Sequence, residues 1–240
     1  MNTQPSLAES GADVKTMFNR VARRYDAANR LMSGGIDIRW RKKAIARLLD
    51  GISDDPQDDP RILDLGAGTL DGSIEILRRA PKARVAAADF AREMLRAGRR
   101  KIPRQGTIET HAADGHHLPY RDDTFDGAFS AFCVRNLSDL KRGLSELRRV
   151  VHPAGRVVIL EFLRPERPRF FFDRIWNAHV LPALGWAVTG DRAAYRYLPE
   201  SIARFRSAPE FAALMREVGF LNVETEPLFP SGVATMVVAS

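Results

Sequence analysis

The chain has 240 residues, 45% of them hydrophobic, which is enough for one sizeable core and excludes a disordered chain. The formal charge of +7 permits nucleic acid or an anionic membrane as partner and selects neither. No apolar run approaches the roughly 18 residues of a membrane-spanning helix, and the first residues lack the pattern of a signal peptide. The single cysteine, Cys133, excludes an internal disulfide and fits a reducing cytoplasm.

A basic helical arm is predicted at the amino-terminal end. Hydrophobic spacing predicts helices over residues 14–25 and 38–49, joined by a glycine turn at 33–35. The basic residues of this arm are Arg20, Arg23, Arg24, Arg30, Arg39, Arg41, Lys42, Lys43 and Arg47. An acidic, proline-containing linker follows at 54–59. We therefore divide the chain into a cap, residues 1–50, and a core, residues 51–240, with a helical insertion at about 164–206.

The run RILDLGAGT over residues 61–69 predicts a buried strand that ends in a glycine turn, with a helix starting near Asp71. Gly66 and Gly68 allow a sharp turn and a close approach of the backbone to a ligand. A second strand, residues 84–89, ends in Asp89, a carboxylate suited to a ribose diol. This pattern predicts a nucleoside-cofactor site at the carboxyl ends of parallel strands. An ordinary strand-to-helix turn is the alternative.

The spacing of the glycines argues against a dinucleotide, which requires G-x-G-x-x-G. Here Gly72 is displaced from the third glycine position, and Asp64 precedes the loop. A carboxylate there would repel a phosphate but suits the ammonium of an amino-acid tail. The loop with Asp64 and Asp89 resembles the motif of class I S-adenosylmethionine-dependent methyltransferases.

The remaining pattern alternates strands and helices. Helices are predicted over 92–100, 138–151 (begun by a capping Ser138) and 208–218, and strands over 107–111, 124–130, 156–162, 221–226 and 233–238. This order predicts an α/β fold, a Rossmann-like doubly wound parallel sheet. The last two strands are close enough to form a hairpin, which would place an antiparallel strand at the sheet edge.

Five blocks of sequence carry a more specific resemblance. They are FNRVARRYDAANRLMS at 18–33 (followed by Trp40), LPYRDDTFD at 118–126, VRNLSD at 134–139, RVVHPAGRVVILEF at 149–162 and AYRYLPES at 194–201. From about residue 15 to its end, the chain is similar to the UbiE/MenG (COQ5) family of quinone-biosynthesis C-methyltransferases. The blocks around 135 and 195–201 are far more specific than the glycine loop.

The resemblance implies S-adenosyl-L-methionine as cofactor and a lipophilic quinol as acceptor, methylated on a ring carbon. It assigns the methionine portion to Asp64, Gly66, Gly68 and Thr69, the ribose to Asp89, and the adenine to Phe90, Asp114 and Gly115. For catalysis it indicates Arg135, Tyr25 and Asn136, and for substrate binding Tyr195 and Tyr197. No metal site is expected, since neither Cys nor carboxylate stands at ligand spacing near His116 and His117.

Several of these residues have a structural alternative. Arg135 could form a salt bridge to Asp26 or Asp139, and Tyr25 could be a packed aromatic instead of a lid. His116 or His117 could assist deprotonation or belong to a loop, and Cys133 reads as a small apolar filler. Phe170–Phe172, in the insertion, read as core or as a channel for a prenyl tail.

The chain also departs from the family pattern, at Ala28, Asp37, Leu70, Ala131, His152, Ala154 and Leu163. Leu70 stands where the family has glycine, so it either crowds the methionine tail of the cofactor or points into the core. This leaves two alternative functions, a methyltransferase for another phenolic or lipophilic acceptor and a non-catalytic scaffold. The basic arm suits the anionic inner face of a membrane, although a solvated charged face is an equal reading. Nucleic acid is disfavoured as partner, and a homo-oligomer is left open.

Overall fold

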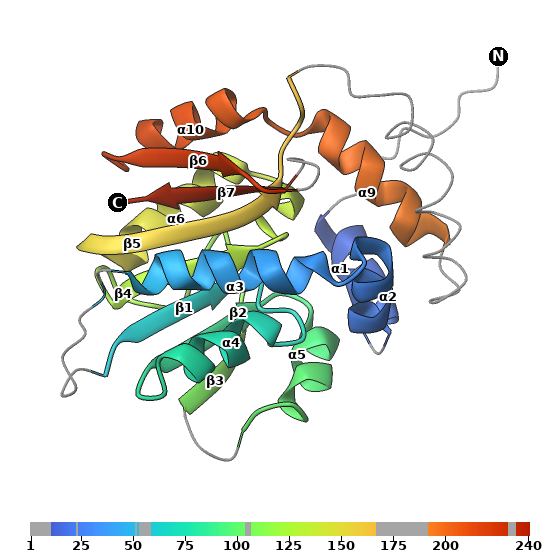
Figure 1. Ribbon diagram of the computed structural model, residues 1–240, viewed down its shortest axis with the longest axis horizontal. Coiled ribbons are helices and arrows are strands. Elements are labelled where there is room, and N and C mark those ends of the chain that lie inside the picture. The colour runs from blue at the N-terminus through green and yellow to red at the C-terminus, as the bar shows by residue number, and fades with distance from the viewer. Residues whose placement is uncertain are drawn as a thin grey trace.

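The computed structural model describes residues 11–22, 24–50, 52, 59–103, 107–166, 192–229 and 234–240. These residues form a seven-stranded sheet with the order β3-β2-β1-β4-β5-β7-β6 (Figure 1). The strands are β1 Arg61–Leu65, β2 Arg84–Asp89, β3 Thr107–Ala112, β4 Phe125–Ala131, β5 Val151–Phe162, β6 Val223–Pro227 and β7 Ala234–Ala239. Strands β1 to β5 pair in parallel, which confirms the doubly wound sheet.

Helices cover both faces of the sheet. They are α1 Gly11–Val21, α2 Tyr25–Ser33, α3 Ile36–Leu49, α4 Asp71–Arg79, α5 Arg92–Arg99, α6 Leu140–Val150, α9 Arg192–Arg204 and α10 Ala208–Glu217, with a 3-10 turn, η1, at Val134–Asn136. Alternation along β1 explains the layers, because Ile62 packs with α3 and α4 whereas Leu63 packs with α6 and α10. In Figure 1, α1, α2 and α9 gather at one end of the sheet.

The terminal hairpin forms at the edge of the sheet and is antiparallel, as predicted. Strand β7 runs antiparallel between β5 and β6, and β6 is the edge strand. The sequences explain this order. Strand β7, ATMVVA, is buried along nearly its whole length, while β6, VETEP, carries the exposed Glu224, the half-buried Glu226 and a proline that suit an edge.

The described residues of the cap form three helices where two were predicted. The helix expected over 14–25 ends at Val21, the chain turns with Arg24 N donating to Val21 O at 2.9 Å, and α2 begins at Tyr25. The break has a packing reason: α1 packs on α5, whereas α2 turns toward the glycine loop. Gly34 and Gly35, with φ of 60° and 78°, then connect α2 to α3.

The expectation that Ser138 caps the helix after β4 was also wrong. Helix α6 begins at Leu140, and its cap is Asp139, whose carboxylate accepts from Arg142 N at 3.0 Å. The Asp139 carboxylate lies directly before the first turn of the helix, where it satisfies one of the backbone amides that have no partner within the helix.

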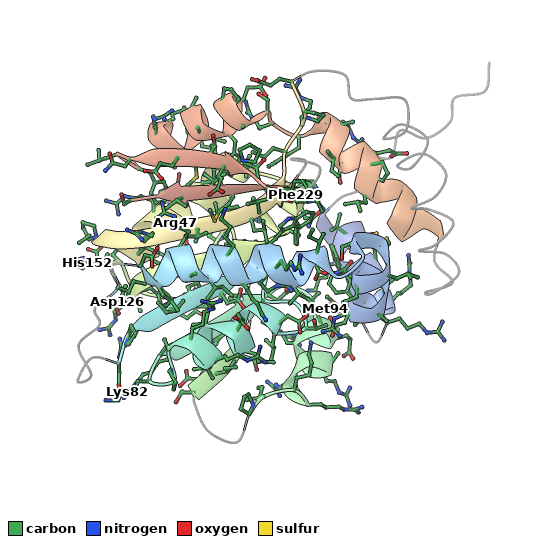
Figure 2. All side chains as sticks on the ribbon, in the orientation of Figure 1. Arg47, Lys82, Met94, Asp126, His152 and Phe229 are labelled. Carbon is green, nitrogen blue, oxygen red and sulfur yellow. The ribbon has the colours of Figure 1, made fainter. Side chains whose placement is uncertain are left out.

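Helix α3 belongs to the sheet packing although it was assigned to the cap. Ala44, Ile45 and Leu48 are fully buried and pack in one cluster with Ile62 and Phe129 of the sheet. Each large side chain buried in this way contributes about 1.5–3 kcal/mol. The start of α3 is fixed as well, because Trp40 Nε1 donates to the backbone oxygen of Phe229 at 2.7 Å (Phe229 is labelled in Figure 2). The α3 helix therefore connects the cap rigidly to the core.

Candidate functional site

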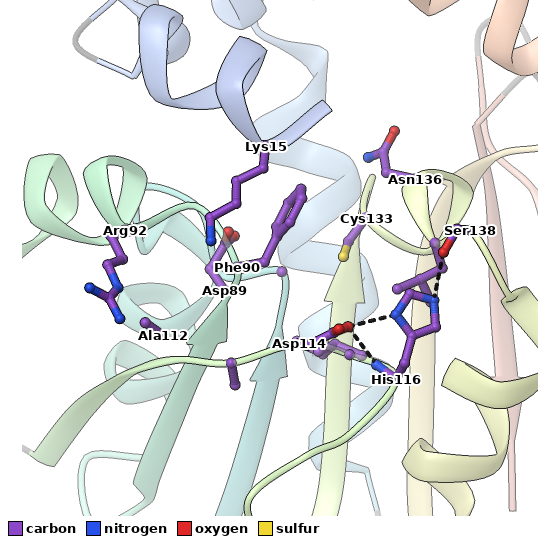
Figure 3. Close-up of a pocket in the computed structure, with 15 residues that line it drawn as sticks. Lys15, Asp89, Phe90, Arg92, Ala112, Asp114, His116, Cys133, Asn136 and Ser138 are labelled. Carbon is purple, nitrogen blue, oxygen red and sulfur yellow. Dashed lines mark hydrogen bonds and ion pairs between the residues drawn. The ribbon is translucent and has the colours of Figure 1, made fainter. Parts of the chain in front are cut away.

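Two adjoining cavities lie where β1, β2 and β4 end. The larger, about 380 Å³, is lined by Asp89 at the end of β2, by Phe90 next to it, and by Asp114 and Gly115 after β3 (Figure 3). The smaller, about 50 Å³, lies under α2 and α3 and against the glycine loop. Gly66 lines both cavities. The two cavities therefore adjoin at Gly66, and we refer to them together as the cleft.

The glycine loop depends on glycine where the two cavities adjoin. Gly66 and Gly68 have φ of 71° and 53°, a region where side chains are strained. A β-carbon at Gly66 would lie 2.2 Å from Cys133 Sγ, so there is no room for one. Cys133 lines the larger cavity as a packed thiol, and burial raises its pKa well above the ordinary value. This is consistent with the filler predicted at that position.

Asp89 fastens the loop to the end of β2. Its carboxylate accepts from Gly68 N at 2.8 Å and from Ala91 N at 2.7 Å. Burial raises its pKa from 3.8 to about 6. Each carboxylate oxygen can accept a second hydrogen bond, so Asp89 can hold a diol while it keeps the loop in place. Figure 3 shows Asp89 and Phe90 side by side on one wall of the cavity.

Asp114 and His116 form the opposite wall. His116 Nδ1 lies 2.6 Å from Asp114 Oδ1 (Figure 3). Its Nε2 accepts from Asp139 N at 3.1 Å. Both ring nitrogens are thus engaged within the wall. His117 contacts the Arg142 guanidinium. These contacts give the two histidines a structural role and do not present either ring as a base.

Asp64 lies at the base of the smaller cavity. Its side chain is buried beneath α4 and accepts from Ser73 Oγ at 2.6 Å. A β-carbon at Gly72 would lie 2.9 Å from Asp64 Oδ2, so glycine keeps the helix close to this carboxylate. Burial raises the pKa of Asp64 from 3.8 to about 6. The residue is an electrostatically costly group that an ammonium ligand would stabilise.

The cap is fixed to the glycine loop by polar contacts. The Thr69 hydroxyl donates to the Asp26 carboxylate of α2. Lys101 Nζ then bridges Asp26 at 2.7 Å and Asp71, the first residue of α4, at 2.6 Å. Asp26 therefore anchors the arm to the glycine loop and to the start of α4.

Leu70 points away from the cleft. It adopts a left-handed conformation, φ 70°, before the first residue of α4, and its side chain is fully buried with Ala67, Ala87 and Leu95. It lines neither cavity. The interpretation that Leu70 crowds a bound cofactor was wrong, and the alternative that it enters the core is confirmed.

Arg135 is paired, but not with either predicted partner. It lies in η1, after β4 has ended at Ala131, and its guanidinium contacts the fully buried carboxylate of Glu161 on β5. Its backbone N donates to Glu161 Oε2 at 3.1 Å, and its Nε donates to Ser201 Oγ of α9 at 3.0 Å. The predicted alternative, a salt bridge from Arg135 to Asp26 or Asp139, was therefore wrong. In the sequence, the one sign of this partner is that Glu161 interrupts the otherwise apolar run VVILEF at 157–162.

The three predicted catalytic residues lie around the cleft without meeting at one point. Tyr25 lines the smaller cavity and Asn136 the larger, whereas Arg135 lines neither. Tyr25 packs edge-on against Phe18, with ring centroids 6.0 Å apart. Burial raises the pKa of Tyr25, although a hydrogen bond to Asn29 and the charge of Arg135 oppose the shift. Tyr25 is thus both a packed aromatic and a wall of the site.

Some predictions fall outside what the structure describes. Tyr195 and Tyr197 lie on α9, but their side chains are outside the described residues, as are Phe170–Phe172. Among the described residues, no cluster of three or more metal-ligating side chains occurs. Within the same ranges, no helix is long and apolar enough to span a membrane.

The model of the ubiE/COQ5 methyltransferase family matches residues 6–239. The chain belongs to this family. A demethylmenaquinone methyltransferase of Thermus thermophilus is 42% identical to this methyltransferase over 206 residues, covering 85% of this chain and 91% of the relative. A ubiquinone/menaquinone biosynthesis C-methyltransferase of Geobacter sulfurreducens is 41% identical over 227 residues, covering 91% of this chain and 84% of the relative. The predicted family is confirmed.

Solved structures confirm the fold. A SAM-dependent methyltransferase of Thermotoga maritima superimposes with a TM-score of 0.62 at 18% identity, covering 94% of this chain and 98% of its own. The [4+2]-cyclase SpnF reaches the same TM-score at 19% identity, covering 92% of this chain and 77% of its own. The fold is therefore that of class I methyltransferases, and it alone does not determine the reaction.

Proposed function

We propose that this methyltransferase transfers the methyl group of S-adenosylmethionine to a ring carbon of a reduced prenylated quinone, a demethylmenaquinol or a ubiquinol precursor. The two relatives named above support this acceptor, one named for demethylmenaquinone and the other for ubiquinone and menaquinone biosynthesis. The observation that carries the proposal is the cleft itself, in which a nucleoside-sized cavity and a small, charged cavity meet at Gly66.

The residues of the cleft fit the two ends of the cofactor. Asp89 would hold the ribose hydroxyls, and Phe90 with Asp114 and Gly115 would flank the adenine. Asp64, Gly68 and Thr69 line the smaller cavity and would hold the methionine portion. The cofactor supplies an electrophilic methyl group. What the protein adds is alignment of the acceptor and exclusion of water.

A hydroquinone ring carbon becomes nucleophilic when an adjacent hydroxyl loses its proton. Because burial raises the pKa of Tyr25, its phenol keeps its proton at neutral pH. Tyr25 is therefore suited to donate a hydrogen bond to the oxygen that carries the developing charge, not to act as base. Asn136 offers an amide from the wall of the larger cavity.

Arg135 supplies a fixed positive charge beside this site. Its charge partly opposes the rise that burial causes in the pKa of Tyr25, and the net shift remains upward. Glu161 and Ser201 fix the guanidinium from two sides. In this proposal Arg135 stabilises the phenolate of the acceptor through its charge, and Glu161 keeps Arg135 in position.

Leu70 no longer favours a non-catalytic scaffold, because its side chain leaves the cleft open.

A methyltransferase for another phenolic acceptor uses the same residues, so the acceptor must be tested directly. Purified protein is incubated with S-adenosylmethionine and either demethylmenaquinol or a hydrophilic catechol, and the products are analysed by mass spectrometry. A methylated quinol is expected. Methylation of the catechol alone would contradict the proposed acceptor.

We also propose that the enzyme works in the cytoplasm at the inner face of the membrane, where a prenylated quinol resides. Around the α2–α3 turn, Leu31 and Ile38 are exposed at 51% and 36%. Exposed Arg24, Arg30 and Arg39 accompany them. Apolar side chains amid basic ones suit anionic headgroups.

The protein should float together with phosphatidylglycerol vesicles in a density gradient, and the double variant Leu31→Glu with Ile38→Glu should no longer float with them. Equal flotation with neutral vesicles would contradict the charge component.

A further inference from the structure

The smaller cavity contains one cationic side chain that no sequence motif pointed to. Arg41, on α3, lines it together with the glycine loop. Its side chain is 13% exposed. Its Nη1 lies 3.4 Å from Asp37 Oδ2 and 3.9 Å from Asp71 Oδ2. Among the described residues, Nε and Nη2 of Arg41 have no hydrogen-bond or ion-pair partner. The guanidinium therefore retains unused donors inside the cavity.

The charge balance of the residues that line this cavity is uneven, although Lys101, outside the lining, pairs with Asp26 and Asp71. Four carboxylates line it, namely Asp26, Asp37, Asp64 and Asp71. Among the described lining residues, Arg41 is the single cation. The amino-acid end of S-adenosylmethionine carries an ammonium and a carboxylate. Carboxylate side chains suit the ammonium, but they repel the ligand carboxylate unless a cation lies next to it.

We propose that Arg41 binds the α-carboxylate of S-adenosylmethionine, reaching it from the cap. The inference rests on the proposed function, which supplies the ligand. A guanidinium donates two parallel hydrogen bonds to a carboxylate, and Arg41 has the unused donors for that geometry. The charge of Arg41 also acts on both Asp64 and Tyr25, so its guanidinium lies within electrostatic reach of the loop and of the cap.

The assignment gives the cap a role in cofactor recognition. Asp64 and the glycine loop come from the core, whereas Arg41 comes from the helix that joins the cap to the sheet. The two charges of the amino-acid tail would thus be bound by different parts of the protein. A ligand without the carboxylate would lose only the contact with α3.

The test compares two ligands that differ only in this group, S-adenosylmethionine and its decarboxylated form, by calorimetry on wild type and Arg41→Met. Arg41→Met should weaken the binding of S-adenosylmethionine by about 10- to 100-fold, the usual effect of losing hydrogen bonds to a charged group. It should leave the affinity for decarboxylated S-adenosylmethionine unchanged. Lys42→Met, an exposed neighbour on α3, is the matched control and should alter neither ligand.

An equal loss for both ligands, or no loss for either, would overturn the assignment. If Arg41→Met does not fold, Arg41→Lys keeps the charge without the fork. Arg41→Lys should still lower the affinity for S-adenosylmethionine and leave the affinity for the decarboxylated ligand unchanged. An equal change in both affinities would again overturn the assignment. Wild type that binds neither ligand would contradict the proposed cofactor instead.

Discussion

Leu70 occupies the space that a side chain at Gly98 would need. A β-carbon at Gly98 would lie 2.6 Å from Leu70 Cγ and equally close to the carbonyl group of Thr69. Leucine in a left-handed conformation costs about 1–2 kcal/mol. Burying its side chain fully returns about 1.5–3 kcal/mol, and the cavity for it exists because α5 has glycine at that position. The two residues are therefore complementary, and the leucine leaves the cofactor cleft clear.

Gly98→Ala should destabilise the protein by about 1–3 kcal/mol, the usual cost of overpacking a core. The new methyl group meets both Leu70 and the backbone of the cofactor loop, so affinity for S-adenosylhomocysteine should fall as well. Urea unfolding and calorimetry measure the two effects. In a double-mutant cycle with Leu70→Ala, the two substitutions should couple. Leu70→Ala removes part of the clash that Gly98→Ala creates, and the new methyl group at position 98 fills part of the space that Leu70→Ala leaves. Strict additivity would show that Leu70 and Gly98 do not share this space.

Asp64→Asn should stabilise the ligand-free protein and weaken its cofactor binding. The pKa of Asp64 is raised from 3.8 to about 6, so the folded protein binds a proton more readily than the unfolded chain. At neutral pH the ionised group therefore costs folding energy, at most about 3 kcal/mol for a shift of this size. An amide removes that cost and keeps an oxygen for Ser73 Oγ, but it loses the charge that faces the ammonium.

The pH dependence tests the same point. Stability of the ligand-free wild type should rise as pH falls through about 6 and level off below about 4, as far as Asp64 contributes. Asp64→Asn should reduce this rise. Affinity for the cofactor should change in the opposite direction, decreasing below about pH 6. An unchanged stability profile in Asp64→Asn would show that the carboxylate is not destabilised by burial.

The sequence predicted the parts of the site that follow strands. Gly66, Gly68 and Asp89 lie where the motif placed them, because a tight turn after a parallel strand allows few alternatives. What it could not predict depends on tertiary contacts. Glu161 is 26 residues from Arg135 and meets it only because β4 and β5 are paired. The direction of Leu70 depends on Gly98 of another helix. Arg41 looks in the sequence like one more residue of a basic arm, and only the packing of α3 brings it to the wall of the smaller cavity.

Glu161→Gln should separate stability from cofactor binding. Breaking a buried ion pair by removing one partner costs about 3–5 kcal/mol, and the Arg135–Glu161 pair is almost fully buried. Turnover should fall because Arg135 loses the group that positions it. Affinity for S-adenosylhomocysteine should change little, since neither residue lines the cavities.

The double variant Arg135→Met with Glu161→Leu is the matched comparison. Two apolar residues of similar volume should recover most of the stability, measured by thermal unfolding, and none of the turnover. A double variant that is stable and active would contradict the role proposed for the Arg135 charge.

Tyr25→Phe should lower turnover about 10²- to 10³-fold, the usual effect of removing one donor to a developing oxyanion. Because burial keeps the phenol protonated at neutral pH, the wild-type rate should show no loss from Tyr25 ionisation between pH 7 and about 9. Phe keeps the ring that packs on Phe18, so stability and cofactor affinity should stay close to wild type. The control is Phe18→Leu, which disturbs the same aromatic pair at a residue that itself lines neither cavity. It should reduce stability more than turnover. Turnover that survives Tyr25→Phe would make Tyr25 a packing residue of the cap, and single-turnover rates at saturating cofactor would distinguish that case from a change in binding.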